Sequence, residues 1–310
     1  MESMNAKQKR HQMYRSWKKG YYHLCTDGWK EGRIFNDREE FRDGMAMMGL
    51  ASLKYDLSIY AFELMPNHLH ILLSASGSTC VDLFGFIKWK LNMELHYDGY
   101  PPLPESYDFR LIPVESAEAF RKNVLYLARN PYEKGYCLPG GHLWGSSYLL
   151  FNQFSEAVRG IPSGQMPSRE VNRLTGSMES FPPEWEIHPE LGILPRNFVH
   201  TEKIRELFSS PKDYLSRLVK DYESFVSLSD SLGEEISFSS EEVRDIVSRM
   251  LRILFPEKSP ANLSSQEKCR AAVELSDRYR LSARDLSLCL RIPEHMILQT
   301  LRSKDYGKGR

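Results

Sequence analysis

Apolar residues in the first 150 positions follow two different spacings, and their alternation along the chain predicts a mixed fold. Strand character is strongest in four short segments that turn residues separate. These segments are Tyr21–Thr26, Leu57–Leu64, His68–Leu73 and Phe109–Val114. Only Met65-Pro66-Asn67 lies between the second and the third, so we expect these two strands to be neighbours with a tight connection.

Three further segments have the spacing of helices. The first opens at Asp37 and the second runs from Val81 to His96, with one apolar stripe along it. The third opens at Ser116. We expect Asn130-Pro131 to end it, because a proline disfavours the helical conformation of the residue before it.

The predicted order of elements is therefore β-α-β-β-α-β-α. A chain with this order most economically forms an antiparallel sheet with helices packed on one face, which is the ferredoxin-like arrangement. We predict an α+β fold of this kind for residues 20–155.

The sequence pattern of residues 156–310 differs from that of the first 155 residues. Six prolines between positions 162 and 195 mark residues 156–200 as a poorly periodic connector with little regular structure. Residues 201–310 are predicted to be helical, with capping boxes at Ser239-x-x-Glu242 and Ser264-x-x-Glu267. An all-helical C-terminal region should thus follow the α+β domain.

Residues 282–302 have the pattern helix, short break, helix, which fits a helix-turn-helix. The second helix would begin at Pro293 and present four polar side chains outward. These are Glu294, His295, Gln299 and Arg302. A plain structural helical hairpin explains the same pattern, so both interpretations stay open.

Composition narrows the class of protein. Hydrophobic residues make up 41% and aromatic residues 12% of the 310 positions, as in ordinary globular proteins. No apolar run approaches the roughly 18 residues of a membrane span, and the N-terminus lacks the apolar core of a secretory signal. Five scattered cysteines without a Cys-x-x-Cys pair argue against disulfides and zinc-thiolate clusters. We expect a soluble, cytoplasmic protein with reduced thiols and no membrane partner.

The formal net charge is zero, which counts against a nucleic-acid function because such domains usually carry a basic excess. The charge is unevenly distributed, however. Residues 7–19 contain six basic side chains and no acidic one, interleaved with His11, Tyr14 and Trp17. Residues 1–19 are therefore either a basic arm suited to phosphate contact and base stacking or a solvated tail.

Candidate chemistry is concentrated in Met65-Pro-Asn-His-Leu-His. Residues two apart on a strand project from the same face, so His68 and His70 can share one metal ion while Leu69 points into the core. Taken alone the pair is a weak signal, because surface histidines and hydrogen-bonded core histidines give the same pattern.

Tyr126 and Asn130 lie four residues apart on a predicted helix and therefore share one of its faces. A phenol and an amide oxygen could approach the same ion together. Alternatively, Tyr126 is an aromatic core residue with a satisfied hydroxyl, and Asn130 caps the helix before the proline.

In combination these motifs resemble those of the REP-associated tyrosine transposases, a branch of the single-tyrosine HUH transposases. The resemblance covers roughly residues 20–150. It is carried by Asp27-Gly28 with Ile34-Phe35, Leu64-Met-Pro-Asn-His-Leu-His-Ile-Leu-Leu, Tyr126-Leu-Ala-Arg-Asn-Pro and Trp144-Gly-Ser-Ser-Tyr148, in that order.

The resemblance implies a catalytic domain in which His68 and His70 are the HUH pair, Tyr126 is the nucleophile and Asn130 is the third metal ligand. The implied activity is cleavage and transfer of single-stranded DNA at hairpin sites through a 5′-phosphotyrosine, with Mg2+ or Mn2+. By ligand chemistry alone, paired imidazoles usually suit zinc, copper or nickel. With phosphate oxygens and water completing the shell, manganese fits better than magnesium. The active form would be a monomer or a homodimer.

Residues that contact DNA are less well marked. Lys88, Trp89 and Lys90 are candidates, with Arg302 in the possible helix-turn-helix, although a solvated helix face explains the first three equally well. Two other functions also fit the sequence. One is a catalytically silent, transposase-derived DNA-binding protein, and the other is a metal-dependent phosphodiesterase that uses water and leaves Tyr126 structural.

Overall fold

The computed structural model describes residues 5–26, 32–134, 136–138, 140–151, 155–232 and 238–307. The chain divides into two compact units, Met1–Val219 and Lys220–Arg310. The boundary thus follows residue 219, whereas the sequence suggested that the helical region starts at residue 201.

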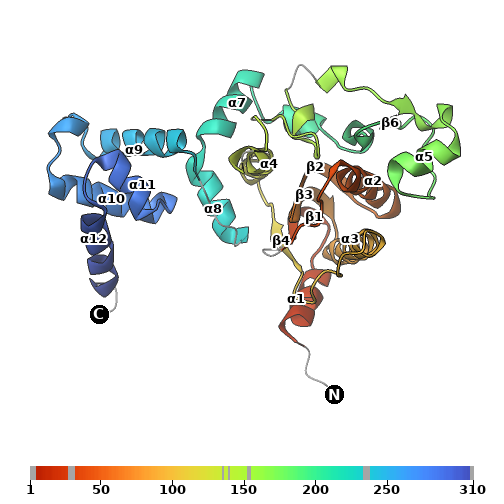
Figure 1. The fold of residues 1–310 in the computed structure, drawn as a ribbon, viewed down its shortest axis with the longest axis horizontal. Helices are drawn as coiled ribbons and strands as arrows, with labels where there is room; N and C mark the ends of the chain where they lie inside the picture. Colours follow the sequence, from red (N-terminus) through yellow and green to blue (C-terminus); the bar gives the residue numbers. More distant parts are fainter. Residues whose placement is uncertain are drawn as a thin grey trace. The chain divides into compact units, whose positions relative to one another are not determined.

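The first unit is built on a four-stranded sheet (Figure 1). Its strands are β1 (Gly20–Thr26), β2 (Ser58–Met65), β3 (His68–Ala75) and β4 (Phe109–Pro113). They are arranged in the order β2-β3-β1-β4, and every neighbouring pair is antiparallel. This is the ferredoxin-like arrangement, so the predicted α+β fold class is confirmed.

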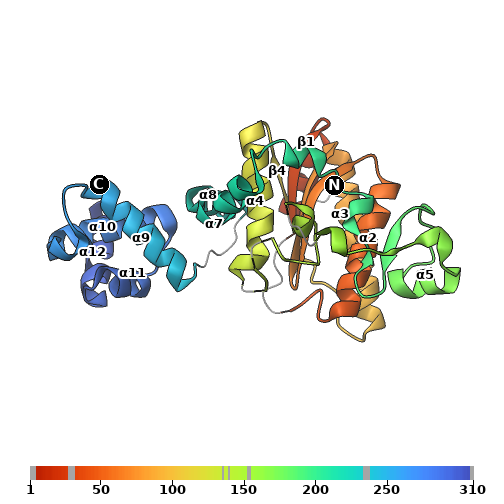
Figure 2. The same ribbon diagram turned by 90° about the horizontal axis from the view of Figure 1, so that it is seen from above.

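Helices cover both faces of this sheet. α2 (Arg38–Lys54) and α3 (Gly77–Tyr97) pack on one face, as predicted, whereas α4 (Ala117–Glu133) covers the other (Figures 1 and 2). Side chains alternate between the two faces of a strand. Leu24, Leu69 and Ile71 point to the side of α2 and α3 and join the main apolar core. The residues between them point toward α4.

The ends of these helices follow from local side chains. Asp37 caps α2 by accepting hydrogen bonds from the amides of Glu39 and Glu40, as its position in the sequence predicted. The prediction for the end of α4 is wrong, because this helix continues through Pro131 to Glu133. The proline is tolerated since only two helical residues follow it, so it disturbs little more than the last turn.

Residues 156–200 contain more regular structure than the sequence indicated. They form α5 (Ser168–Thr175) and a small sheet of β5 (Ile161–Pro162), β6 (Glu186–His188) and β7 (Gly192–Ile193). Apolar side chains from this segment, Phe181, Trp185, Ile187, Ile193 and Phe198 among them, belong to the main core. Strands of two or three residues have no readable periodicity, which is why the pattern did not reveal them.

The remaining elements of the first unit are short. α6 (Glu202–Arg205) and α7 (Pro211–Lys220) follow the small sheet, and α7 ends one residue beyond the boundary. The 3-10 turns of this unit are Ser147–Leu149, Ser155–Ala157, Ser163–Gln165 and Pro195–Asn197.

The basic N-terminal segment forms helix α1 (Ala6–Arg15), which packs against α3. Lys7, Arg10 and His11 surround the buried carboxylate of Asp108. The approach to α3 is so close that a Cβ on Gly77 would overlap the backbone of α1. Several basic side chains of residues 1–19 are therefore engaged within the fold, rather than being part of a solvated tail.

The second unit is helical, as the sequence predicted. It contains α8 (Tyr222–Leu232), α9 (Ser240–Leu254), α10 (Ser265–Tyr279), α11 (Ala283–Leu290) and α12 (Glu294–Gly307), with a 3-10 turn at Pro260–Asn262. Both predicted capping boxes are present, at the start of α9 and of α10.

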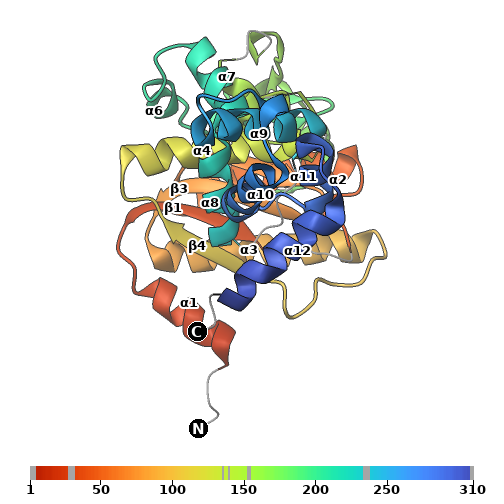
Figure 3. The same ribbon diagram turned by 90° about the vertical axis from the view of Figure 1, so that its left-hand side faces the viewer.

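α11 and α12 are separated by Arg291-Ile292-Pro293 and contact each other and α10 (Figure 3). The four side chains expected to point outward, Glu294, His295, Gln299 and Arg302, are exposed. The helix-break-helix pattern is therefore present, and its use in DNA binding stays a prediction.

Two predicted absences concern membranes and disulfides. In the described part of the chain, no helix has both the length and the apolar character that crossing a bilayer requires. The five cysteines all lie within the described ranges and form no disulfide there.

A buried carboxyl group attaches the segment after α4 to the sheet. Glu63 of β2 is fully buried, and its Oε1 accepts a hydrogen bond of 2.9 Å from the amide of Ser147. Gly145 lies so close that a Cβ at this position would overlap the Glu63 carboxyl. Burial raises the pKa of Glu63 to about 8. The group is therefore mostly protonated at neutral pH.

Replacing Glu63 by glutamine tests this attachment through the pH dependence of stability. Because the pKa is raised from 4.5 to about 8 in the folded state, the wild type has its full stability at low pH and loses part of it as the pH rises through 8. Glutamine has no such proton to lose. We expect the free energy of unfolding of Glu63→Gln, relative to wild type, to increase by roughly 3–4 kcal/mol between about pH 5 and about pH 9 in urea titrations.

The matched control is Glu170→Gln, which changes an exposed carboxyl group of the same unit. It should show no such increase. A Glu63→Gln difference that stays flat across this pH range would contradict a buried, protonated Glu63.

Candidate active site

The predicted histidine pair converges on one point of the sheet surface. β3 begins at His68, directly after the turn Pro66-Asn67, and alternation along the strand directs His68 and His70 toward α4. Both are buried, and their Nε2 atoms lie 3.1 Å apart. Leu69 belongs to the main core on the opposite face, as predicted.

α4 brings the other two predicted residues to the same place. Nδ2 of Asn130 lies 3.1 Å from Nε2 of His70. The ring of Tyr126 stands edge-on to that of His70, with 5.6 Å between centroids and 82° between planes. The structure therefore brings together all four residues that the sequence singled out.

The structure also bears on the alternative interpretations of Tyr126 and Asn130. Tyr126 is only 2% exposed, so it also has the burial of a core aromatic residue. Asn130 does not cap α4, because the helix continues past it and Lys134 is the C-cap. Its side chain is directed at the histidines instead.

Two further residues join the site that the sequence did not reveal. Nε2 of His23, on β1, lies 3.1 Å from Nδ1 of His70. Nδ1 of His23 lies 2.7 Å from Oδ1 of Asn123, whose Nδ2 donates to the carbonyl of Ala119 at 2.8 Å. The result is a continuous chain of hydrogen bonds from the backbone of α4 to His70.

This chain fixes which nitrogen of each imidazole carries the proton. The amide oxygen of Asn123 can only accept, so Nδ1 of His23 must be the donor. A neutral His23 then accepts at Nε2, and Nδ1 of His70 must donate to it. Nε2 of His70 is left as the lone-pair nitrogen. This is the arrangement in which outer hydrogen bonds orient a metal-binding histidine.

His68 follows the same logic. Its Nδ1 lies 2.7 Å from Oδ1 of Asn67, which accepts, so Nε2 is again the lone-pair nitrogen. The two Nε2 atoms lie 3.1 Å apart, and with both rings neutral in these tautomers each of them is an acceptor. Nδ2 of Asn130 lies 3.1 Å from the lone pair of His70 Nε2, and a cation between the two rings would take the place of this donor.

The donor geometry fits a divalent cation. Two ligands bonded at about 2.1 Å and at right angles, as in an octahedral shell, lie about 3.0 Å apart, close to the observed 3.1 Å. Within the described ranges, no cluster of three or more His, Cys, Asp or Glu side chains is placed to bind a metal. The side chain of Asn130 lies against His70, so its amide oxygen could reach the same ion once the amide is turned.

Of the four residues suggested for DNA contact, Lys88, Trp89 and Lys90 lie away from this site. Lys88 donates hydrogen bonds to the carbonyls of Pro104 and Tyr107, at 3.2 and 3.1 Å, and burial lowers its pKa. Trp89 is 53% exposed and Lys90 lies over its ring. These three belong to α3, on the face of the sheet opposite to α4 (Figure 2). Arg302 is exposed on α12 of the second unit.

A sequence signal for Asn123 existed but is subtle. Asn123, Tyr126 and Asn130 are spaced three and four residues apart, which gives a polar stripe along a helix that is otherwise apolar at these turns. His23 stands in a strand whose pairing with β3 cannot be read from the sequence. The Asp27-Gly28 motif lies outside the described residues.

Comparisons with known proteins were made on sequence and on structure. No protein-family model and no curated protein matches the chain. The chain is similar to a solved REP-associated tyrosine transposase. That structure is bound to a REP hairpin and is 13% identical in sequence. The similarity covers 60% of this chain and 99% of the other, with a TM-score of 0.37. A score this low carries no argument, so the interpretation rests on contacts within this chain.

Removing the acceptor at position 123 should weaken metal binding without touching a ligand. In Asn123→Leu, Nδ1 of His23 loses its hydrogen-bond acceptor, so the proton of His23 is no longer held on that nitrogen. Nδ1 of His70 then need not be the donor to His23, and Nε2 of His70 is no longer held as the lone-pair nitrogen. We expect the Mn2+ dissociation constant, measured by titration calorimetry, to rise about 10- to 100-fold.

Asn123→Asp keeps an acceptor at the same position and is the matched control. Its Mn2+ affinity should stay near that of the wild type, with both variants checked for folding by thermal melting. Equal loss of affinity in the two variants would show that the residue serves packing rather than the orientation of His70.

Proposed function

We propose that this chain is a DNA-cleaving and strand-transferring enzyme of the transposase kind, with Tyr126 as its nucleophile. The observation that carries the proposal is the convergence of His68 and His70 from one strand with Tyr126 and Asn130 from one helix. The proposed substrate is single-stranded DNA next to a hairpin, since attack by one tyrosine acts on one strand at a time.

The residues that would hold the metal are His68, His70 and Asn130. A divalent cation bound there would polarise the scissile phosphate and offset the negative charge of the transition state. Two imidazoles and one amide oxygen form a mixed shell, which suits Mn2+ better than Mg2+. Metal identity is therefore part of the proposal, with Mn2+ preferred.

Tyr126 supplies the nucleophilic oxygen. A phenol has an ordinary pKa of about 10, so it must lose its proton as it attacks. Its oxygen bonds to phosphorus while the bond from phosphorus to the 3′ oxygen breaks, which leaves a 5′-phosphotyrosine and a 3′-hydroxyl. A second 3′-hydroxyl can then attack the phosphotyrosine and restore the phenol. The covalent link keeps the energy of the broken bond, so no nucleotide cofactor is needed.

The burial of Tyr126 adds a requirement. Because its ring is 2% exposed, the hydroxyl group must become accessible to the scissile phosphate when DNA binds.

The helix-break-helix segment of the second unit could contribute to holding the DNA, through exposed side chains such as Arg302.

A covalent-adduct assay tests the proposal. The full chain is incubated with labelled single-stranded hairpin DNA and Mn2+, and the products are separated under denaturing conditions. We expect a protein–DNA adduct that is abolished in Tyr126→Phe, by at least about 100-fold, because only the attacking oxygen is removed. EDTA should abolish it as well. Tyr97→Phe, at a position 88% exposed on α3, is the control and should form adduct normally.

Each other outcome assigns a different function. Cleavage without an adduct, unchanged in Tyr126→Phe, would indicate a phosphodiesterase that uses water. Binding without cleavage by the wild type would indicate a DNA-binding protein that has lost the reaction. Either result would overturn the proposal.

A further inference from the structure

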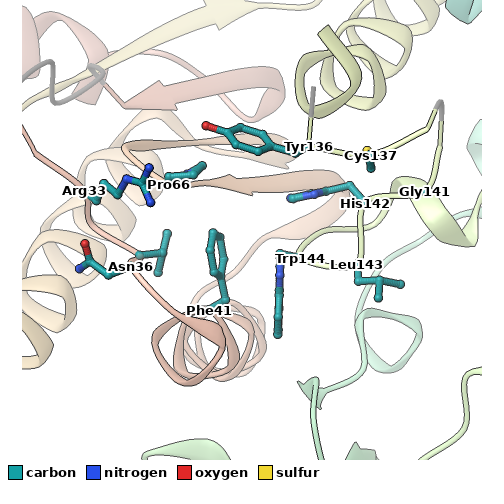
Figure 4. Close-up of a pocket in the computed structure, with 11 residues that line it drawn as sticks. Arg33, Asn36, Phe41, Pro66, Tyr136, Cys137, Gly141, His142, Leu143 and Trp144 are labelled. Carbon is teal, nitrogen blue, oxygen red and sulfur yellow. The ribbon is translucent and has the colours of Figure 1, made fainter. Parts of the chain in front are cut away.

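A pocket of about 360 Å³ lies beside the hairpin that carries the two histidines (Figure 4). This volume is in the range of small-ligand sites, about 300–1,000 Å³. Its walls come from the segment around Arg33 and the start of α2, from the turn at Pro66, and from the segment that follows α4. The proposed reaction uses none of these side chains.

Hydrogen bonds tie the pocket to that hairpin. The backbone amides of Ile34 and Phe35 donate to the carbonyl of Pro66 at 2.6 and 3.1 Å. Pro66 precedes His68 by only two residues, so their Cα atoms are at most about 7.6 Å apart. The pocket therefore lies at the turn of the hairpin that carries His68.

The opposite wall is tied to the helix of the nucleophile. The amide of Tyr136 donates to the carbonyl of Pro131, in the last turn of α4, at 3.0 Å. Further along, Nε2 of His142 donates to the carbonyl of Leu64 at 2.9 Å. Both elements that build the candidate active site thus also hold the pocket.

The pocket offers flat aromatic surface. Phe41 stacks on Phe35 and on Trp144, with centroid distances of 5.0 and 5.1 Å and interplanar angles of 24° and 17°. Tyr136 borders the same space from the side across from Phe41 (Figure 4). The side chain of Tyr136 is 53% exposed. Because Phe41 is stacked between two other rings, the surface on which a nucleobase can stack is the exposed ring of Tyr136.

The pocket also offers polar groups for orientation. Arg33 is exposed, and among the residues that the structure describes it has neither an ion-pair nor a hydrogen-bond partner. Because Nε2 of His142 is the donor to Leu64, its Nδ1 is an acceptor, and burial keeps the ring neutral by lowering its pKa. A guanidinium group and a neutral acceptor suit a phosphate and a base, respectively.

We propose that this pocket binds one unpaired nucleobase of the DNA strand, stacked on Tyr136 and adjacent to the phosphate that Tyr126 attacks, with Arg33 on the neighbouring phosphate. The identity of the strand as a substrate rests on the proposed function. Binding of the base does not, since it requires neither metal nor cleavage.

The test measures binding without reaction. A fluorescent single-stranded hairpin probe, selected from a random pool for binding to the full wild-type chain, is titrated in EDTA with anisotropy as the readout. We expect Tyr136→Ala to weaken binding about 5- to 100-fold, the range found for the loss of one stacked base. Arg33→Ala should also weaken binding and should reduce its dependence on salt concentration.

Controls match each substitution. Tyr97→Ala removes a tyrosine that is 88% exposed, and Arg169→Ala removes the same charge from an exposed position of the same unit. Both should bind like the wild type. A second set of probes carries one abasic site, placed at each position in turn. One of these probes should bind the wild type only as weakly as the intact probe binds Tyr136→Ala, because the stacked base is missing. Tyr136→Ala should bind that abasic probe no more weakly than the wild type does.

The pocket proposal and the proposed function can fail separately. Wild-type affinity in both Tyr136→Ala and Arg33→Ala, or a failure to select any binding probe, would overturn the pocket proposal even if a Tyr126 adduct forms. Loss of affinity in Tyr136→Ala, together with no covalent adduct formed by the wild type, would support the pocket and contradict the role of Tyr126 as the nucleophile.

Discussion

The close approach of two buried imidazole nitrogens, Nε2 of His68 and Nε2 of His70, places the strongest constraint on this fold. The two nitrogens face each other at 3.1 Å, and Nδ2 of Asn130 lies 3.1 Å from the nitrogen of His70. The arrangement persists because outer hydrogen bonds hold the protons on the far nitrogens, through Asn67 for one ring and through His23 and Asn123 for the other. Buried polar groups placed in this way are costly unless a partner of opposite charge joins them. A cation site is the economical explanation.

The sheet separates an apolar environment on one face from a polar environment on the other, so the buried polar groups are kept together. On the face of α2 and α3, leucine and isoleucine side chains form a continuous apolar core, to which residues 156–200 contribute further aromatic residues. On the face of α4, the polar residues of β1, β2 and β3 are gathered together. Glu63 belongs to this second face and holds the segment around Ser147 against β2. The same segment supplies Trp144 to the pocket, so the attachment of one loop serves both the fold and the pocket.

The sequence was most informative where regular elements are long and least informative where strands are short or pairing decides the outcome. The alternation of β3 and the helical spacing of α4 predicted that His68 and His70 share one face of a strand and that Tyr126 and Asn130 share one face of a helix. That the two pairs come together was implied by the resemblance of the motifs to a known family. His23 was missed because the register of β1 against β3 depends on tertiary packing, and a lone histidine in a strand has no distinguishing pattern.

Other differences have equally specific causes. The three strands between Ile161 and Ile193 are too short for any periodicity to appear. Lys88 reads as a phosphate contact in a basic run, yet the loop that its ammonium group binds, at Pro104 and Tyr107, is distant in sequence. Local pattern reveals the type of a residue and the face on which it lies. It does not reveal which backbone carbonyl will reach it.

The coordination of a bound ion tests the central claim most directly. Mn2+ is added to the full chain labelled with 15N histidine, and pulsed electron paramagnetic resonance detects the nitrogens bonded to the metal. The account predicts couplings to two directly bound histidine nitrogens, one of which disappears in His68→Ala and one in His70→Ala. A Mn2+ signal without histidine nitrogen coupling, or one unchanged in both variants, would contradict a metal site between these two imidazoles.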